Sequence, residues 1–508
     1  MGSLLIDDAH SCVKKARNQV TIKIKKSSIY YKQFWEIFKH DLEKQSSGQF
    51  LSIERGSYSV SKMIPYWSWK DNQSKVKDII NDMYEDGASE ITFSHNLIID
   101  YLDSCQCYIS GNELEITPLR IPVEKVPAYN NAKHRFILSA TFSNNSDLVN
   151  ELDIDVNSVQ NPIEIKNISD VGERMILAPS KYHSDINREF IGKILKAHSA
   201  NHNIVVLAPT YKQAKKWENY GAKVIQNDID DEIENLNNTQ GNFVVFVNRY
   251  DGIDLSGDSC HFLVIDGIPK GETVKEKSHS IMRPDSNYLL SQKAQSIEQG
   301  LGRAVRSGSD YCVVFMLGDD LLNFISRKTN LKFFSEQTQS QLDLTLTLIQ
   351  EVKSSSTWEE AWTEVKTAVN LCLERDAGWT SMYKDNLKKY AETSHNTPNL
   401  LSLAQKEHLG LILYSNHDYE ASYAEINSII TDSLLVDSQE KGWYYQILAE
   451  IMYSSNKTRS NDLQIKALKN NGNLLKPIHP TKEKKENQPL LRLKNLYKKY
   501  KISHQTWI

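Results

Sequence analysis

The chain has 508 residues, a length that predicts about three domains rather than one. Hydrophobic residues make up 40% of it and charged residues 24%, which is typical of a folded globular protein and argues against intrinsic disorder. The formal net charge is −4, so a protein that coats nucleic acid through overall positive charge is excluded, and any nucleic-acid site must be local.

Membrane and metal-cluster signals are weak along the whole sequence. The longest apolar runs, such as Phe243–Val247, are far shorter than the ~20 residues that a membrane-spanning helix needs, so we expect no membrane partner. Six cysteines in so long a chain, with no apolar leader after Met1, favour a cytoplasmic protein with free thiols. Cys105 and Cys107 form a lone C-x-C pair, and because a zinc or iron–sulfur site usually needs four ligands, we expect them to lie in a strand.

The first predicted element is a short buried strand over Leu4–Ile6, which ends in Asp7-Asp8-Ala9-His10. Two adjacent carboxylates at the carboxyl end of a strand can divide the work of nucleotide hydrolysis, one holding Mg²⁺ through water and the other orienting the attacking water. Taken alone, the tetrapeptide would be a solvated turn by default. Because a buried strand needs a sheet around it and few residues precede this one, we expect part of its domain to be missing upstream.

A helical pattern occupies residues 27–101, where apolar residues such as Phe34 and Phe38 recur at helical spacing. We therefore predict an all-helical insert. Trp67 and Trp69 lie within it and either stack on nucleic-acid bases or pack in the core, and we favour core packing.

Three further strands are predicted after the insert. Two lie at Cys107–Ile109 and Leu114–Ile116, and a proline-containing connector leads to the third, Phe136–Leu138. This last run ends in Ser139-Ala140-Thr141, three small residues at the carboxyl end of a buried strand.

Residues 170–328 have a different hydropathy pattern, in which short apolar runs alternate with amphipathic segments. Strands that are buried on both faces lose the alternation of inward and outward side chains, so this pattern predicts an α/β domain with a parallel sheet between two layers of helices. The predicted strands are Met175–Ala178, Ile204–Ala208, Phe243–Val247, Phe262–Ile265 and Cys312–Leu317.

The pattern is helical over residues 330–475. Short antiparallel helix pairs, as in tetratricopeptide repeats, would suit this region, although no clear repeat period is present. The final stretch, 476–508, contains a basic tail, since Thr481–Lys501 has eight Lys or Arg against two Glu. Such a tail either binds phosphate groups or is a solvated chain end.

Two segments of the α/β region carry polar chemistry. Tyr250–Leu255 follows a predicted strand, and Gln299–Arg306 reads Q-G-L-G-R-A-V-R. Arg303 and Arg306 are three residues apart, so on a helix they would project from one face, while Gly302 lets the backbone approach a partner closely. Two guanidinium groups on one face suit a triphosphate, whose charge they neutralise. In isolation, an arginine pair bonded to neighbouring acids is the simpler explanation.

In this order and spacing, these segments resemble the motifs of superfamily-two helicases of the DEAD/DEAH-box type. Asp7–His10 resembles motif II, Ser139–Thr141 motif III and Val247–Leu255 motif V, and Ile204–Tyr211 is similar to the motif IV region. Gln299–Arg306 matches the motif VI pattern Q-x-x-G-R-x-x-R at every fixed position. The long separation of motifs II and III is similar to the XPD/DinG-like group, in which an arch-like helical domain is inserted there.

The resemblance implies a role for each matching residue. Motif II would hold the metal and activate water, motif III would couple hydrolysis to movement along nucleic acid, and motifs V and VI would contact the nucleotide. The implied roles are Asp7 as Mg²⁺ ligand through water, Asp8 as catalytic base, His10, Ser139, Ala140 and Thr141 as coupling residues, Gly252, Asp254 and Gly302 as nucleotide-binding residues, Gln299 as orienting residue, and Arg303 and Arg306 as arginine fingers. Asp8 replaces the commoner Glu of D-E-A-H and has a shorter reach.

The resemblance also implies an α/β fold of the RecA-like, P-loop NTPase type, with ATP and Mg²⁺ as cofactors. The expected partners are nucleic acid, DNA in preference to RNA, and a protein bound by the C-terminal helices. An iron–sulfur cluster is not supported, since the family's cluster cysteines would precede motif II. The expected domains are a truncated first RecA-like lobe at 1–26 and 102–165, an arch-like insert at 27–101, a second RecA-like lobe at 170–328, a helical and repeat-like region at 330–475, and a basic tail at 476–508.

The phosphate-binding loop G-x-x-x-x-G-K-[S/T] does not occur in this sequence, because Gly192-Lys193 is followed by Ile194. Without such a loop, no ring of backbone N–H groups and no lysine holds the β- and γ-phosphates. We therefore expect an ATP-dependent helicase or translocase that is N-terminally incomplete, is impaired alone, and takes its Walker-A lobe from another chain if it has one. The alternative is a non-catalytic nucleic-acid- or protein-binding scaffold derived from a helicase.

Overall fold

The computed structural model describes most of the chain. It covers residues 2–479 apart from 140–144, 164–171, 251, 256, 272, 306–307, 353–356, 393–399, 433–434 and 436, with 388–392 described by backbone alone. Three predicted site residues, Ala140, Thr141 and Arg306, lie outside the described residues, as does almost all of the basic tail. No helix in the described part is both long enough and apolar enough to cross a membrane.

A six-stranded, wholly parallel sheet forms the centre of the second half of the chain. The strand order is β7-β12-β11-β8-β10-β9, and the four inner strands, β8, β10, β11 and β12, are buried almost throughout. The predicted α/β fold with a parallel sheet is thereby confirmed, and it is consistent with a RecA-like lobe. Strand β9 is one that the sequence pattern did not reveal. The strands are β7 (Glu173–Leu177), β8 (Ile204–Ala208), β9 (Lys223–Ile225), β10 (Phe243–Val247), β11 (Phe262–Asp266) and β12 (Tyr311–Leu317).

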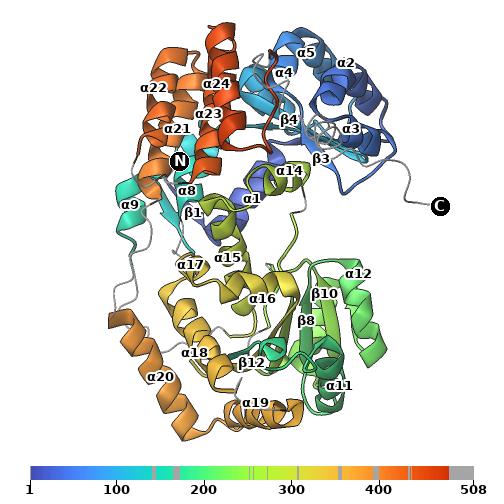
Figure 1. The fold of residues 1–508 in the computed structure, drawn as a ribbon, viewed down its shortest axis with the longest axis vertical. Helices are drawn as coiled ribbons and strands as arrows, with labels where there is room; N and C mark the ends of the chain where they lie inside the picture. Colours follow the sequence, from blue (N-terminus) through green and yellow to red (C-terminus); the bar gives the residue numbers. More distant parts are fainter. Residues whose placement is uncertain are drawn as a thin grey trace, which may run out of the picture.

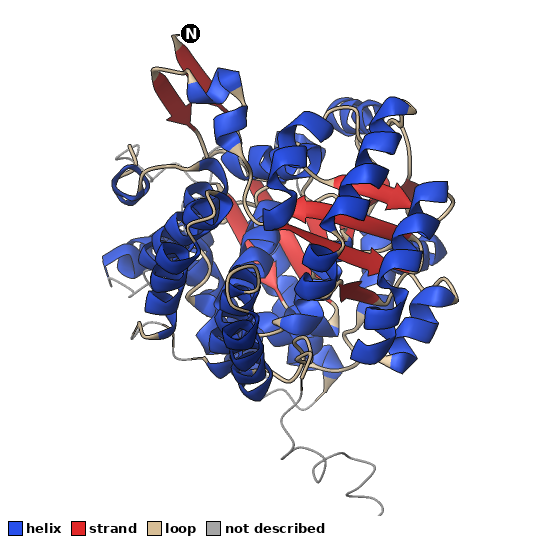
Figure 2. Ribbon diagram, turned by 90° about the horizontal axis from the view of Figure 1, so that it is seen from above, coloured by secondary structure: helices blue, strands red, loops and turns tan. Residues whose placement is uncertain are grey.

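Helices cover both faces of this sheet (Figure 2). Their apolar sides join the strands in one large core, in which Trp217, Phe246 and Phe315 are almost completely buried. The helices within this region are α10 (Pro179–Tyr182), α11 (Arg188–His198), α12 (Tyr211–Ala214), α13 (Ile229–Asn238), α14 (Val274–Met282), α15 (Asn287–Leu301), α16 (Asp319–Ser326) and α17 (Lys328–Leu331).

A separate two-stranded parallel sheet joins the two ends of the predicted first lobe. Strand β1 (Ser3–Ile6) pairs with β6 (His134–Ile137), so that Leu5 lies opposite Phe136. Figure 2 shows this small sheet beside the N-terminus, apart from the larger one. The accompanying helices are α1 (Ala9–Gln19), α7 (Pro127–Asn130), α8 (Ser146–Leu152) and α9 (Val156–Gln160).

The predicted insert is not all-helical. Its strand β3 (Ser61–Met63) is the edge of a four-stranded antiparallel sheet of order β2-β5-β4-β3, whose other strands are β2 (Ile22–Lys25), β4 (Cys105–Ser110) and β5 (Glu113–Pro118). The pattern missed β2 and β3 because each is short and lies between strong helical signals. The helices of the insert are α2 (Ile29–Gln45), α3 (Ser47–Glu54), α4 (Tyr66–Asp71), α5 (Gln73–Glu85) and α6 (His95–Ile98).

Four residues with alternative sequence interpretations lie in the core of this region. Cys105 and Cys107 are buried in β4, which confirms that they are strand residues. Trp67 and Trp69 are buried as well, and the indole N–H of Trp69 donates to the backbone oxygen of Leu102 at 2.8 Å. Core packing of both tryptophans is therefore confirmed, and base stacking is not available to them in this conformation.

The helical region predicted at 330–475 divides into two groups. Helices α18 (Glu336–Val352), α19 (Trp358–Leu373) and α20 (Ala377–Glu392) extend the core of the parallel sheet, where the Thr345 hydroxyl donates to the backbone oxygen of Ile176 at 2.9 Å. Helices α21 (Leu401–Ser415), α22 (Tyr419–Ile430), α23 (Ser438–Met452) and α24 (Lys457–Asn470) form a bundle at the other end of the molecule (Figure 1). Each group is thus defined by the sheet that it covers.

Buried polar contacts attach the α21–α24 bundle to the antiparallel sheet and its helices. The Gln106 amide donates to Glu450 Oε2 at 2.8 Å, the Tyr414 hydroxyl donates to the backbone oxygen of Asp103 at 2.9 Å, and Tyr66 bonds Ser460 at 3.2 Å. Burial raises the pKa of Glu450 to about 7, because the charged carboxylate is costly away from water.

Replacing Glu450 with glutamine is expected to make stability less dependent on pH. The folded-state pKa is raised above the unfolded value of ~4.3, so the folded chain keeps its proton between about pH 4 and pH 7, and unfolding releases it. The free energy of unfolding of the unaltered chain therefore falls as the pH rises across this window. Relative to the unaltered chain, E450Q should become more stable by up to about 3 kcal/mol over the same rise in pH. Urea unfolding at pH 5 and pH 8 measures this difference, with the exposed Glu364→Gln as control. Equal differences at the two pH values would contradict the prediction.

Candidate functional site

The carboxyl edge of the parallel sheet is the part of the fold where open α/β sheets place their ligands. Tight turns follow its central strands. Gly267, after β11, has φ +117°, and Gly318, after β12, has φ +88°. A Cβ on Gly318 would lie only 3.0 Å from Gly267 Cα, so these two loops approach each other at a distance that side chains would prevent.

The segment after β10 is held to the end of α15 by one arginine. Arg303 Nη1 donates to the backbone oxygen of Ile253 at 2.8 Å, and Arg303 Nε donates to those of Gln299 and Tyr250 at 2.9 and 3.1 Å. In return, the Leu255 amide donates to the backbone oxygen of Arg303 at 3.1 Å. The structure thus joins the two segments predicted as motifs V and VI, and it uses Arg303 to position the loop.

Two positions in these segments require glycine, one for its backbone conformation and the other for lack of space. Gly252 has φ +76°, a backbone conformation that other residues rarely adopt. Gly300 lies against Tyr250, whose ring carbon would be 3.0 Å from a Cβ at this position. Gly302, by contrast, has φ −74° and room for a side chain, so within the chain the close approach belongs to Gly300 and not to the predicted Gly302.

Tyr250 connects the two segments that Arg303 joins to the neighbouring parts of the sheet edge. Its hydroxyl donates to the backbone oxygen of Gly267 at 2.8 Å and lies 3.3 Å from that of Leu207. Burial, followed by the nearby charge of Asp266, raises the pKa of Tyr250 well above its ordinary value, so it remains a neutral donor. The sequence analysis placed Tyr250 in motif V without a role, and only its three-dimensional contacts show one.

Asp266, at the last position of β11, is a buried carboxylate that the sequence analysis missed. Arg188 Nη2 bonds its Oδ1 at 2.6 Å and Arg188 Nε lies 3.0 Å from both oxygens. The Trp217 indole N–H donates to Oδ2 at 2.9 Å, and the Gln213 amide donates to Oδ1 at 3.2 Å. Asp266 is 0% exposed, so this network ties the starts of α11 and α12 to the carboxyl edge. The sequence offered one signal for this residue, namely an acidic side chain directly after the apolar run Phe262–Ile265.

The predicted motif II residues lie at the end of β1. The Asp8 amide donates to Asp7 Oδ1 at 3.0 Å, and Asp8 Oδ1 accepts from the Ser11 amide at the start of α1. Both carboxylates are exposed, whereas His10 is buried. The Ala9 amide donates to the backbone oxygen of Leu138 at 2.9 Å, which places the motif II segment beside the residues that precede Ser139.

The donor chemistry at this strand end fits a hard cation. Asp7 and Asp8 offer carboxylate oxygens, the ligands that Mg²⁺ prefers, and their exposure leaves room for the waters that it retains. Among the described residues, no group of three or more His, Cys, Asp or Glu is arranged to hold a metal by itself. A metal at Asp7 therefore needs water or a phosphate as further ligands, and this role stays a prediction.

The remaining predicted residues lie near Arg303 in the fold. Gly252 and Asp254 are exposed in the loop after β10, and Gln299 is partly buried in the last turn of α15. The structure thus brings the described site residues together as two groups. Asp7, Asp8 and His10 gather beside Ser139 on the small sheet, and Gly252, Asp254, Gln299, Gly302 and Arg303 gather at the large one.

Comparison with known proteins supports a helicase-type second lobe. Residues 191–337 match the family of helicase C-terminal domains, a span that contains most of the parallel sheet and both segments that Arg303 joins. No curated protein matches the chain.

Two solved structures are similar to the chain. An XPD helicase structure aligns at 16% identity with a TM-score of 0.36, over 65% of this chain and 66% of that one. An XPD structure described as apo aligns at 18% identity with a TM-score of 0.37, over 65% of this chain and 74% of that one. The chain thus spans just under two thirds of the first of these structures.

Proposed function

We propose that this chain is part of an ATP-dependent motor that moves on nucleic acid, with DNA as the preferred substrate. The observation that carries the proposal is the junction of Arg303 with the loop after β10. It lies at the carboxyl edge of a parallel sheet, within the span that matches helicase C-terminal domains. The junction links this loop to α15, which runs toward the small sheet (Figure 1), so that a nucleotide bound at the loop would be coupled to the rest of the motor.

A second part of the proposal is that another RecA-like segment completes the small sheet and brings the phosphate-binding loop. Parallel strands are normally covered on both faces, and two strands alone are marginally stable. Here Leu5 is 65%, Phe136 54% and Leu138 47% exposed. Covering these apolar side chains by further strands and helices would stabilise β1 and β6 and would place phosphates next to Asp7 and Asp8.

The chain's own residues would then have separate tasks. Asp7 would hold Mg²⁺ through water, and the metal would supply charge neutralisation at the phosphates. Asp8, which already orders the first turn of α1, would orient the attacking water. Gln299 and Arg306 would face the γ-phosphate, while Arg303, whose guanidinium is engaged by backbone oxygens, would position the loop that carries Gly252 and Asp254.

ATP hydrolysis by the purified chain tests this proposal. We expect background turnover from the chain alone, with or without single-stranded DNA, because the pattern of the phosphate-binding loop does not occur in its sequence. Addition of a separately purified RecA-like lobe with an intact loop should give DNA-stimulated turnover. That turnover should be lost with either a loop Lys→Ala lobe or Asp7→Ala in this chain. Robust turnover by the unaltered chain alone would contradict the need for a second lobe.

The second candidate is a non-catalytic nucleic-acid- or protein-binding scaffold, with the α21–α24 bundle as a protein-binding part. Two observations favour it. Asp8 caps a helix, and Arg303 bonds three backbone oxygens, so both groups have structural tasks that need no nucleotide. DNA binding that persists in Asp7→Ala, without turnover in any mixture of lobes, would support this candidate over the motor.

A further inference from the structure

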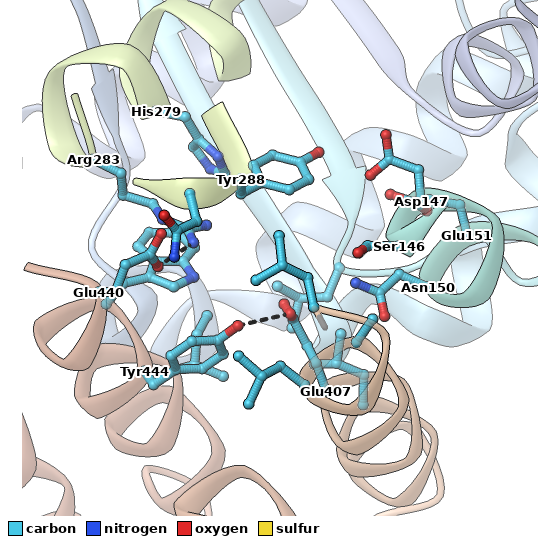
Figure 3. Close-up of a pocket in the computed structure, with 18 of the residues that line it drawn as sticks. Ser146, Asp147, Asn150, Glu151, His279, Arg283, Tyr288, Glu407, Glu440 and Tyr444 are labelled. Atoms are coloured by element: carbon cyan, nitrogen blue, oxygen red, sulfur yellow. Dashed lines mark hydrogen bonds and ion pairs between the residues drawn. The ribbon is translucent and has the colours of Figure 1, made fainter. Parts of the chain in front are cut away.

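A cavity that is partly open to solvent, with charged groups in a largely apolar wall, lies away from the predicted motifs, between α8, α14, α15, α21 and α23 (Figure 3). Its volume is about 120 Å³, close to that of a cavity that holds a benzene-sized molecule. The cavity is thus lined by the predicted first lobe, the second lobe and the C-terminal bundle together, so an occupant would contact all three parts.

Two of the acidic groups at this cavity are already neutralised. Glu440 forms a buried ion pair with Arg283, in which Nη2 lies 2.6 Å from Oε2. Glu151 is paired with Arg17 of α1. Figure 3 shows Arg283 and Glu440 on one side of the cavity and Glu151 on the other.

Other charged groups at the cavity have no opposite charge bonded to them. Asp147 and the ammonium group of Lys275 have no hydrogen-bond or ion-pair partner among the described residues, and Glu407 accepts only from the Tyr444 hydroxyl, at 3.0 Å. Burial raises the pKa of Asp147 to about 7, raises that of Glu407, and lowers that of Lys275 to about 8. All three shifts show that these charges are poorly compensated where they lie.

Two buried atoms at the cavity also lack hydrogen bonds. Asn150 Oδ1, an acceptor, and Arg283 Nε, a donor, have no partner among the described residues. A buried polar atom without a hydrogen bond is destabilising, so a ligand that bonded both atoms would gain binding free energy from each. Asn150 Oδ1 requires a donor, and Arg283 Nε requires an acceptor.

These groups are separated in space according to their chemistry. The donors Lys275 and Arg283 lie on α14 and its C-terminal cap, whereas the acceptors Asp147 and Asn150 lie on α8 and Glu407 on α21. Apolar side chains complete the wall, among them Leu403, Leu411 and Ile447. A matching ligand has an anionic end, a cationic end and a small apolar body.

We propose that the cavity binds a small zwitterion of the α-amino-acid class with a short aliphatic side chain. Its carboxylate faces Lys275 and Arg283, and its ammonium group faces Asp147, Asn150 and Glu407. A lone anion would leave Asp147 and Asn150 Oδ1 without a donor, and a lone cation would leave Lys275 and Arg283 Nε without an acceptor. A metal ion does not fit, since no described group of three acidic, His or Cys residues is arranged to ligate one.

Calorimetric titration of the full chain in the absence of ATP tests this proposal with three probes of one shape. L-leucine has both charges, isoamylamine only the cation, and 4-methylpentanoate only the anion. We expect L-leucine to bind at least about tenfold more tightly than either single-charge probe, because each of those leaves one side of the cavity unpaired. Equal affinities for the three probes would show that the cavity does not recognise the two charges, and this result, or no heat from any of the three, would overturn the proposal.

Matched variants locate the binding. Lys275→Met and Glu407→Gln should each weaken L-leucine binding by at least about tenfold, whereas Lys277→Met, on the same helix but outside the cavity lining, should leave it unchanged. Circular dichroism confirms that each variant is folded before titration. Leucine affinity that is the same in all three variants would place the binding elsewhere and refute this site. The probe comparison on the unaltered chain stands whether or not a variant folds.

Discussion

Replacing Asp266 with alanine is expected to lower the free energy of unfolding by about 3–5 kcal/mol, the largest effect of any single substitution proposed for this chain. The carboxylate is completely buried and compensates the guanidinium of Arg188. Its removal would leave the buried indole N–H of Trp217 without an acceptor, and it would take the buried counter-charge from the partly exposed guanidinium of Arg188. Chemical denaturation of the full chain, followed by tryptophan fluorescence, measures the change.

Two further variants make this test specific. Asp343→Ala makes the same substitution on the exposed side of α18 and should change stability by less than about 0.5 kcal/mol. Asp266→Asn keeps the shape and one acceptor but not the charge, so its cost should lie between those of the two alanine variants. If Asp266→Ala cost less than about 1 kcal/mol, the network would not be what holds α11 and α12 to the carboxyl edge.

Replacing Arg303 with alanine is expected to release the loop after β10 while leaving the sheet folded. Three backbone oxygens lose a charged donor, and hydrogen bonds to charged groups contribute about 1.5–3 kcal/mol each. Amide hydrogen exchange at Leu255 should therefore accelerate by on the order of a hundredfold, whereas exchange in β11 should not change. Arg303→Lys should behave almost as alanine does, since one ammonium group cannot reproduce the planar fork of donors.

The control for this experiment is Arg327→Ala, which removes an exposed arginine from the same lobe. Its Leu255 exchange should match that of the unaltered chain. Unchanged exchange in Arg303→Ala would show that the loop is held by other contacts, such as the packing of Tyr250 on Gly300. In that case the proposed link between the two motif segments would lose its support.

The strands of the second lobe could be predicted closely because their pattern has a single physical cause. Predicted and observed bounds agree for Ile204–Ala208 and Phe243–Val247, and differ by one residue for the strand at Phe262–Asp266. A central strand of a parallel sheet is buried on both faces, so every position is apolar and the run is visible without knowledge of its neighbours. The short strand Ser61–Met63 has no such signature, because its pairing with β4 alone makes it a strand.

The sequence by itself determined which residue types stand at the ends of strands and in what order, including the pattern at Gln299–Arg306 that predicted a helicase-type lobe. Tertiary structure alone decided what those residues contact. Arg303 donates a hydrogen bond to the backbone oxygen of Ile253, and Arg188 donates to the carboxylate of Asp266, although the partners are far apart along the chain. Periodicity records whether a side chain is buried, which is a local property. The identity of its neighbour depends on how distant segments pack, and no local pattern carries that information.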